Sequence, residues 1–509
     1  MSAVDHVPPI APDAPNRRAL ILPGGGMRVA YQAGAVQRLH EAGLRFSYAD
    51  GTSGGLMNLA ALLSGMEPEA LALRWRSLVA RRFVSPAPLR AWLGFPNLPA
   101  FGGFAGIAKY VLPHLGVDLD RLRAAQGITA QFNVCDFAAK AVVPIPHSEM
   151  SQPLLLAGMS LPIFTPAVEA EGRTWTDAVW IRDSNILASV RAGANEIWVV
   201  WCIGDTPRFL NGVLNQYVHM IEMSAVGALN AELAEIAAMN AAIASGGRPH
   251  GHDAPIRVHL IRPDLPIPLD PDYVAGRVSG DALVDQGYMD GARYLAAGSP
   301  EAGAAPTHTP APAPGVAFRE RMIGRISFAT EDPATGWADV NAVPVVLEAT
   351  IDIRDVAAFV ADRAHRGGMA AHLWSPRLGF TRPAAATNFQ LFSPSDQPDC
   401  TEMVYELGLL RDGEPYWFSG RKFVRRGPPW RLWRDTTTLH VRLHEGGDRR
   451  GRVVAAGMLR LGVIDFLKLG LTLHARDSIG VGRRISAVMR FVSFFADSLW
   501  RTYGFGPRT

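Results

Sequence analysis

The first 300 residues alternate short apolar runs with longer segments of helical periodicity. Runs that predict strands occupy 19–22, 46–50, 128–143, 196–202 and 256–262. Apolar residues recur at helical spacing directly after residue 55 (Leu56, Leu59, Ala60, Leu63) and over 209–244 and 282–297. Strands that alternate with helices are typical of a layered core. We therefore expect an α/β fold here.

The pattern changes at about residue 298. Segment 299–317 alternates Ala with Pro, which predicts a linker between two domains. Beyond it, β-branched and aromatic runs separated by turn signals predict strands at 343–353, 387–392, 403–410, 416–424 and 436–443. We expect 318–509 to be a mainly β domain, a sandwich or a barrel, with a C-terminal helix.

That C-terminal helix is predicted from an apolar stripe flanked by arginines. The stripe consists of Ile485, Val488, Met489, Val492, Phe495 and Leu499. Such a stripe packs a helix onto its own domain, or holds it on a membrane surface. Another apolar stretch, 92–104, is interrupted by Pro and Gly; it predicts either a flap at an active-site mouth or a buried connection.

Composition limits the class of protein. With 509 residues, 48% of them apolar, the chain is long enough for two cores, and a net charge of +3 does not indicate nucleic acid binding. Three scattered cysteines favour reduced thiols and a cytoplasmic location. Residues 1–18 are rich in Pro and Ala and predict a disordered tail without a signal peptide. The sequence contains no run of about twenty apolar residues, so we expect no membrane-spanning helix.

Two glycine clusters carry the candidate chemistry. Gly24, Gly25 and Gly26 follow the first strand, and 51–55 reads Gly-Thr-Ser-Gly-Gly at a strand-to-helix junction. Consecutive glycines bring backbone amides close to an anion, and Gly51 and Gly55 would let Ser53 sit on a sharp turn. A dinucleotide-binding loop is excluded because the last glycine of G-x-G-x-x-G is missing. The pair predicts an acyl-transfer site with an oxyanion hole.

These motifs resemble those of the patatin-like phospholipase family. The family's Gly-Gly-Gly-x-Arg-Gly loop is matched by Gly24, Gly25, Gly26 and Arg28, and its Gly-x-Ser-x-Gly elbow by 51–55; Val29 departs from the final glycine of the loop. For residues 19–298, the resemblance implies a three-layer α/β/α fold. It also implies a Ser-Asp dyad that forms an acyl-enzyme.

The resemblance also points to the second catalytic group. Asp177 lies where the family has its aspartate, although Ala178-Val179 replaces Gly-Gly or Gly-Ala; Asp183 is the alternative acid. In the implied dyad, Asp177 takes the proton of Ser53 and the loop amides hold the oxyanion. Arg28 either supports the glycine loop or faces an anionic group of the substrate.

These features together predict a serine lipid acyl hydrolase of the phospholipase A or lysophospholipase type. We expect it to use no cofactor or metal, to act on a lipid ester and to contact membranes peripherally. An acyltransferase or thioesterase with the same dyad, and a non-catalytic lipid-binding protein, remain alternatives. An α/β-hydrolase triad is disfavoured because Ser53 follows only two strands and His250 and His252 lie in a polar turn.

A second resemblance concerns the C-terminal region. The segments 324–328, 388–392 and 435–439 are similar to an accessory module of sterol-type glucose-methanol-choline oxidoreductases. This similarity implies a lipid-related role for the second domain. No catalytic constellation is apparent there.

Overall fold

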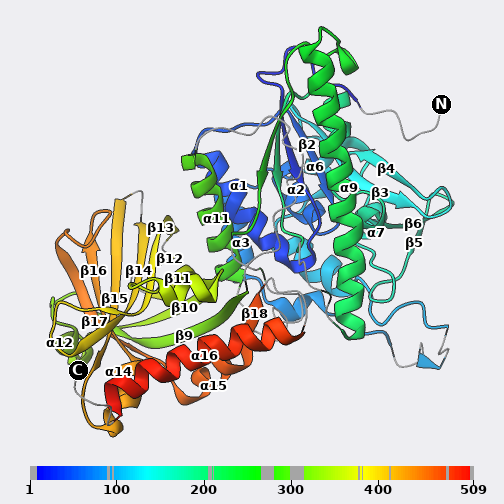
Figure 1. The fold of residues 1–509 in the computed structure, drawn as a ribbon. Helices are drawn as coiled ribbons and strands as arrows, with labels where there is room; N and C mark the ends of the chain where they lie inside the picture. The colour runs from blue at the N-terminus through cyan, green and yellow to red at the C-terminus, as the bar shows by residue number, and fades with distance from the viewer. Residues whose placement is uncertain are drawn as a thin grey trace. The chain divides into compact units, whose positions relative to one another are not determined.

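The computed structural model describes most of the chain. The residues outside the description are 1–7, 89–91, 94–96, 205–208, 210, 265–266, 268–279, 298–313, 376–378, 381, 412–413, 477–480 and 505–509. The chain divides into two compact units, 1–205 with 210–308, and 206–209 with 309–509. Each is described separately (Figure 1).

The first unit contains an eight-stranded sheet. Its order is β5-β6-β3-β2-β1-β7-β8, with β4 paired to β3. The parallel strands are β1 (Arg18–Leu22), β2 (Tyr48–Thr52), β3 (Thr129–Asp136), β7 (Glu196–Val200) and β8 (Arg257–Ile261). Antiparallel pairing adds β4 (Ala141–Pro146), β5 (Val168–Ala170) and β6 (Arg173–Asp177). The carboxyl ends of β1 and β2 therefore lie at the same edge of the sheet.

Helices cover both faces of this sheet. Leu20 and Leu22 point toward a core shared with α1 (Ala30–Glu41), α2 (Gly55–Leu63), α3 (Pro68–Ser77) and α11 (Gly280–Ala297). Ala19 and Ile21, alternating with them along β1, point toward α8 (Ile186–Arg191) and α9 (Val213–Ala244). This period-2 alternation creates two cores on one sheet, so the unit is the expected three-layer α/β/α structure.

The second unit is a closed antiparallel barrel. Its strands, in order, are β9 (Gly315–Ser327), β10 (Val343–Ile353), β11 (Arg366–Ser375), β13 (Arg382–Pro394), β14 (Cys400–Arg411), β15 (Glu414–Arg425), β16 (Thr438–Glu445) and β17 (Val453–Arg460). The last strand, β17, pairs with β9, which closes the ring. Of the two expected architectures, the barrel is the one observed. Its closure pairs every one of these eight strands with a neighbour on both sides.

Two further strands and a long helix complete this unit. β12 (Gly379–Phe380) extends β11, and β18 (His474–Arg476) pairs with β9. The C-terminal helix α16 (Val481–Tyr503) places Ala487 and Phe491 in the hydrophobic cluster of the barrel. Of the predicted stripe, Val488, Phe495 and Leu499 pack against this cluster, whereas Ile485, Met489 and Val492 are exposed. The helix therefore packs onto its own domain with only part of the predicted stripe.

The remaining elements are short. They are η2 (Gly26–Val29), η3 (Ala80–Phe83), η4 (Ile107–Val111), α5 (Leu112–His114), α6 (Leu119–Arg123), η5 (His147–Glu149), α7 (Gln152–Ala157), η6 (Ala178–Trp180), η7 (Pro249–Gly251), α12 (Pro333–Ala338), α13 (Val356–Ala361), η8 (Pro429–Arg431), α14 (Leu432–Thr437) and α15 (Val463–Thr472). Among the described helices, none combines the length and the apolar character that crossing a bilayer requires.

The N-terminal tail differs from the sequence-based expectation. We expected disorder through residue 18, but residues 8–17 are packed on the first unit. Ile10 is buried, its amide donates to the Ala192 carbonyl at 2.9 Å, and the Arg17 guanidinium donates to the Ile10 carbonyl at 3.2 Å. One apolar side chain and two hydrogen bonds thus hold a segment whose composition indicates disorder. Residues 1–7 lie outside the described part.

Both ends of the predicted linker can be compared only partly with the structure. Residues 298–313 are outside the described part, and β9 already begins at Gly315, inside the segment assigned to the linker.

In the stretch 92–104, which we expected to be a flap or a buried connection, residues 94–96 are also outside the description. The described remainder joins another loop, because the Phe101 amide donates to the Ile163 carbonyl at 2.8 Å.

Candidate active site

Ser53 lies on a sharp turn between a strand and a helix. β2 ends at Thr52 and α2 begins at Gly55, and Ser53 itself has φ +52°. A non-glycine residue in this region is strained and is retained where surrounding contacts enforce it. The geometry is that of a nucleophile elbow, which turns a serine hydroxyl out of the end of a sheet. Ser53 is 5% exposed.

Glycines allow this turn to sit directly against the first strand. A Cβ on Gly55 would lie 2.0 Å from the Leu22 carbonyl oxygen, and one on Gly54 would lie 2.5 Å from that of Gly26. Neither position therefore has room for a side chain. At Gly51, by contrast, an added Cβ would meet the side chain of Leu59. The elbow and the glycine loop are thus in backbone contact.

The amides of the glycine loop have different partners. Gly24 donates its N–H to Asp183, at 2.9 Å to Oδ1 and 3.0 Å to Oδ2. Gly26 has φ +60° and begins η2. Among the described residues, no partner occupies the amides of Gly25 or Gly26. Of the three glycines predicted to form the oxyanion hole, two therefore have amides available for an anion.

A chain of buried amide groups holds this loop in place. Gln32 Nε2 donates to the Pro23 carbonyl at 2.6 Å and to the Val200 carbonyl at 3.2 Å. Asn58 Nδ2 donates to Gln32 Oε1 at 3.1 Å, and Trp75 Nε1 donates to Asn58 Oδ1 at 2.6 Å. Satisfied buried networks are rigid, so they fix the start of the loop. No sequence motif indicated this network of amides.

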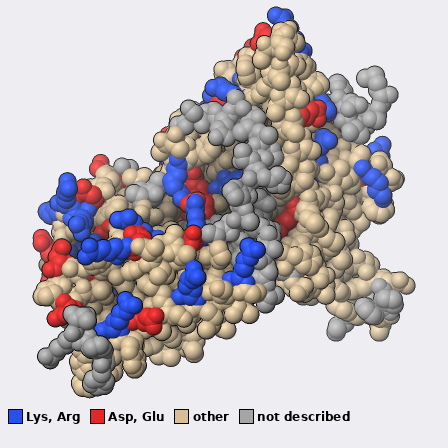
Figure 2. All heavy atoms as spheres, viewed as in Figure 1, with Lys and Arg blue, Asp and Glu red and all other residues tan. Residues whose placement is uncertain are grey.

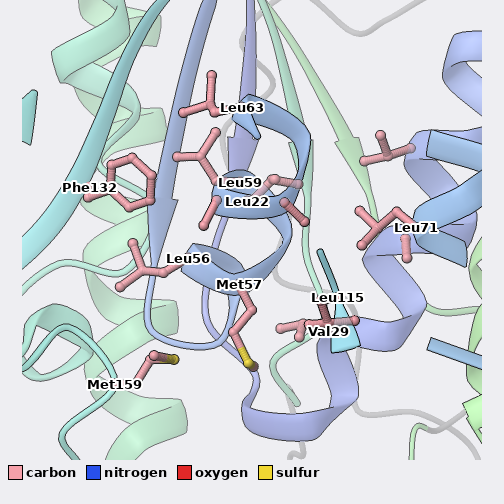
Figure 3. Packing of buried hydrophobic residues seen from close by; sticks show 14 of the residues in the cluster. Leu22, Val29, Leu56, Met57, Leu59, Leu63, Leu71, Leu115, Phe132 and Met159 are labelled. Atoms are coloured by element: carbon pink, nitrogen blue, oxygen red, sulfur yellow. The ribbon is translucent and has the colours of Figure 1, made fainter. Parts of the chain in front are cut away.

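Arg28 and Val29 both have structural contacts. Arg28 is buried, and its Nε donates to the Gly25 carbonyl at 3.1 Å, a contact that supports the glycine loop. Val29 is fully buried in the core that includes Leu22 and Leu56, and Figure 3 shows it among those packed side chains. A Cβ on Gly54 would also lie 2.9 Å from Val29. The departure at Val29 is therefore a packing change.

Asp177 lies at the end of β6, and its side chain is fully buried. Burial raises its pKa to about 7, while the Ser53 hydroxyl and the Val179 amide counteract part of that effect. The amide donates to Oδ1 at 2.9 Å. Oδ2 has no hydrogen-bond partner among the described residues, so it forms no hydrogen bond with the Ser53 hydroxyl in this structure. Catalytic hydrogen bonds often shorten only when substrate is bound.

The two residues after Asp177 fill core space. Ala178 packs with Cys135 and Val142, and Val179 belongs to the core beneath α8 and α9. Neither residue has a positive φ, so the backbone here has no requirement for glycine. The departure from Gly-Gly or Gly-Ala thus leaves Asp177 in position at the end of its strand.

Asp183 has a partner far away in sequence. It is the alternative candidate for the catalytic acid, and its carboxylate accepts the amide of Gly24. Burial raises its pKa well above the usual range, the Gly24 amide opposes this, and the charges of Asp177 and Glu232 raise it further. Two buried carboxyls therefore lie near Ser53, and their partners distinguish them: Asp183 binds the loop, whereas Asp177 has a free oxygen.

Tyr217 is a residue that sequence analysis missed. It comes from α9, its hydroxyl donates to the Pro162 carbonyl at 2.7 Å, and its ring contacts Phe164 and Trp180 edge to face. Its pKa is raised by burial and by the charge of Asp177. The nearby Ile163 and Phe164 are exposed. Apolar surface thus adjoins the loop that precedes Asp177.

A second missed group lies beneath the elbow. Asn133 Nδ2 donates to Asp50 Oδ1 and to Thr52 Oγ1, and Asn185 Nδ2 donates to Asn133 Oδ1 at 2.9 Å. Asp50 is fully buried, and burial raises its pKa well above the usual range. This network joins β2, β3 and the start of α8. The available signals were an asparagine within a predicted strand, Asn133, and another just before a helix, Asn185, but both occur too commonly to identify a network.

The histidines do not form a triad or a metal centre in the described residues. His252, expected in a solvated turn, is instead buried, with Nε2 2.8 Å from the Val190 carbonyl oxygen. Within the described ranges no group of three His, Cys, Asp or Glu side chains could hold a metal ion.

Comparison with known proteins agrees with the fold of the first unit. Residues 20–189 match the model of the family described as Patatin-like phospholipase, so this part of the chain is a patatin-like domain. That family indicates a lipid acyl hydrolase. No curated protein matches the chain. Among solved structures, VipD from Legionella pneumophila is similar over 56% of this chain and 67% of its own, with 13% identity and a TM-score of 0.27.

Proposed function

We propose that the protein is a serine lipid acyl hydrolase in which Ser53 is the nucleophile and Asp177 the general base. The observation that carries this proposal is the combination at one sheet edge: a serine at positive φ, a buried aspartate with a pKa of about 7, and two amides without partners. A base with a pKa near the working pH is suited to proton transfer. The match of residues 20–189 to the family model supports the same chemistry.

The reaction proceeds in two halves. Asp177 accepts the Ser53 proton as Oγ attacks the ester carbonyl, and the amides of Gly25 and Gly26 donate to the oxyanion. Collapse of the tetrahedral intermediate releases the alcohol, which takes the proton from Asp177, and leaves an acyl-Ser53 ester. Water, deprotonated by Asp177, then attacks this ester; the fatty acid leaves and Ser53 regains its proton.

A lipid ester is the proposed substrate. Support comes from the exposed apolar side chains of Ile163 and Phe164, in the loop that precedes Asp177, and from Phe101, whose amide donates to that loop. Exposed apolar groups beside a polar reaction centre suit a substrate with an acyl chain and a polar ester. Phospholipid or lysophospholipid is the substrate class, with phospholipase A or lysophospholipase activity.

Labelling with a fluorophosphonate probe tests the nucleophile. The wild-type protein should be labelled, and Ser53→Ala should not be, whereas the control Ser77→Ala, on the exposed end of α3, should be labelled normally. Equal labelling of Ser53→Ala would refute the assignment. An unlabelled wild type would favour the non-catalytic alternative, although Val29, Ala178 and Val179 have packing roles that do not indicate a decayed site.

Product analysis separates hydrolase from transferase. With a phospholipid substrate and no added acceptor, the proposed enzyme releases free fatty acid. Transfer of the acyl chain to an added alcohol or lysolipid, at the expense of free acid, would identify an acyltransferase. Preference for an acyl thioester would identify a thioesterase.

A further inference from the structure

The helix α15 in the second unit has an apolar face in contact with solvent. All ten of its residues are described and none is buried, although six are large apolar side chains. Leu471 is 87% exposed, Ile464 69% and Leu467 63%. Soluble proteins rarely expose contiguous apolar surface of this kind without a partner for it.

The exposed residues occupy one side of the helix. Val463, Ile464, Leu467 and Leu471 follow the i, i+1, i+4, i+8 spacing, which places them within about 100° of one another around the axis. Leu469, on the other side, packs against the barrel, and Thr472 Oγ1 accepts the Arg319 amide at 3.0 Å. One side of the helix is therefore fixed to the barrel, while the opposite side is exposed to solvent.

Aromatic side chains extend this surface. Trp433 on α14 contacts Phe466 on α15 edge to face, with ring centroids 5.4 Å apart. Trp430, three residues earlier, is 81% exposed. Tryptophan is enriched at the level of lipid headgroups, because its ring is apolar and its N–H is polar. The four apolar residues of α15 together with Trp430 and Trp433 are called the α15 face below.

Two exposed cations adjoin the α15 face: Lys468 on α15 itself and Arg434 on α14. Arg434 Nε lies 3.5 Å from the buried Asp435, whose carboxylate also accepts the Tyr503 hydroxyl at 2.9 Å. Asp465 is the acidic residue of α15 itself. In the lower left of Figure 2, where Figure 1 draws the second unit, Lys and Arg side chains, with some Asp and Glu, stand apart on a largely uncharged surface.

We propose that the α15 face docks on an anionic lipid bilayer. The apolar side chains of α15 and the two tryptophans enter the boundary between headgroups and acyl chains, and Arg434 and Lys468 contact anionic headgroups. Charge complementarity favours this occupant over a second copy of the chain, because two copies of the face would bring their cations together. The proposal is independent of the chemistry at Ser53.

Co-sedimentation of the full chain with vesicles tests the proposal. Vesicles of phosphatidylcholine alone are compared with vesicles that contain phosphatidylglycerol. The wild type should bind the anionic vesicles, and less so at high salt. Leu467→Asp and Leu471→Asp should each weaken binding about tenfold, because a charge replaces a side chain that enters the boundary region. Lys468→Glu should weaken binding to anionic vesicles only.

The matched control is Val340→Asp. Val340 is 86% exposed in the same unit but lies between α12 and β10, so the same type of change should leave binding unaltered. Ser53→Ala should also bind normally, which separates docking from catalysis. Wild-type protein that stays in the supernatant, or aspartate variants that bind as well as wild type, would overturn the proposal. So would a wild-type dimer that Leu467→Asp dissociates without any change in vesicle binding.

Discussion

Asp183 accepts the amide of Gly24, a residue 159 positions earlier in the chain. The contact determines which glycine amides are available to an oxyanion. It also positions the loop close to the nucleophile, because a Cβ on Gly24 would lie 3.2 Å from Ser53 Oγ. We therefore propose that the carboxylate of Asp183 supports the loop, while Asp177 is the base.

Asp183→Ala should remove this support, whereas Asp183→Asn should retain much of it. Asparagine keeps an oxygen that accepts the Gly24 amide, but alanine leaves that buried N–H without a partner. We expect kcat/KM for a phospholipid to fall by about 10- to 100-fold in Asp183→Ala, and far less in Asp183→Asn. An inactive Asp183→Asn beside an active Asp177→Asn would instead make Asp183 the base.

Asp177→Asn should abolish turnover without unfolding the protein. The amide still accepts the Val179 N–H through its oxygen, but it cannot take a proton from Ser53. Loss of a general base lowers the rate by about 10²- to 10⁴-fold. Steady-state kinetics measures this effect, and circular dichroism checks the fold. Activity close to wild type would place the base elsewhere.

The pH dependence of activity should follow the ionisation of Asp177. Because its pKa is about 7 and only the carboxylate accepts a proton, kcat/KM should level off above pH 7 and fall about tenfold per pH unit well below it. Initial rates between pH 5 and 9, measured with a neutral substrate, test this. A profile that is flat through pH 7 would contradict the assignment of Asp177 as base.

The stability of the protein should also depend on the ionisation of Asp177, but it should fall with rising pH where activity rises. Burial raises the pKa of Asp177 from 3.8 to about 7, so its favourable contribution is present below pH 3.8 and is lost as the pH rises through 7. Asp177→Asn has no charge to bury and should be the more stable protein at pH 8, by at most about 4 kcal/mol. Urea unfolding at pH 5 and pH 8 measures the change. A variant less stable than wild type at pH 8 would be inconsistent with a buried charge that its hydrogen bonds compensate only in part.

Gly24→Ala should impair catalysis through the position of Ser53. The added methyl would lie 2.7 Å from Ser53 Cβ and 2.8 Å from Asp183 Oδ1, so the loop or the elbow must shift. We expect a loss in kcat of about 100-fold, since small displacements at a reacting centre have large effects. The control Gly227→Ala lies on α9 with nothing within 4 Å of the added Cβ, and should keep full activity.

Local sequence patterns were sufficient for most elements near the site. The elbow could be predicted because a strand, a glycine-flanked serine and an apolar helix are consecutive in the chain, and the strand predicted at 343–353 matches β10. Patterns failed where long-range contacts override composition. Ile10 is anchored by Ala192, and the missed strands β9, β11 and β17 gain their hydrogen bonds from neighbours in the barrel.

The sequence by itself determined which class of chemistry we propose. The spacing of glycines around Ser53, with an aspartate after a later strand, is a local property, and the family-model match over 20–189 agrees with it. Only the tertiary structure decided which contacts these residues make. The pairing of Gly24 with Asp183, the burial of Asp177 and the packing of Val29 against Gly54 each depend on segments far apart in the chain, whose proximity follows from the sheet order and not from any local pattern.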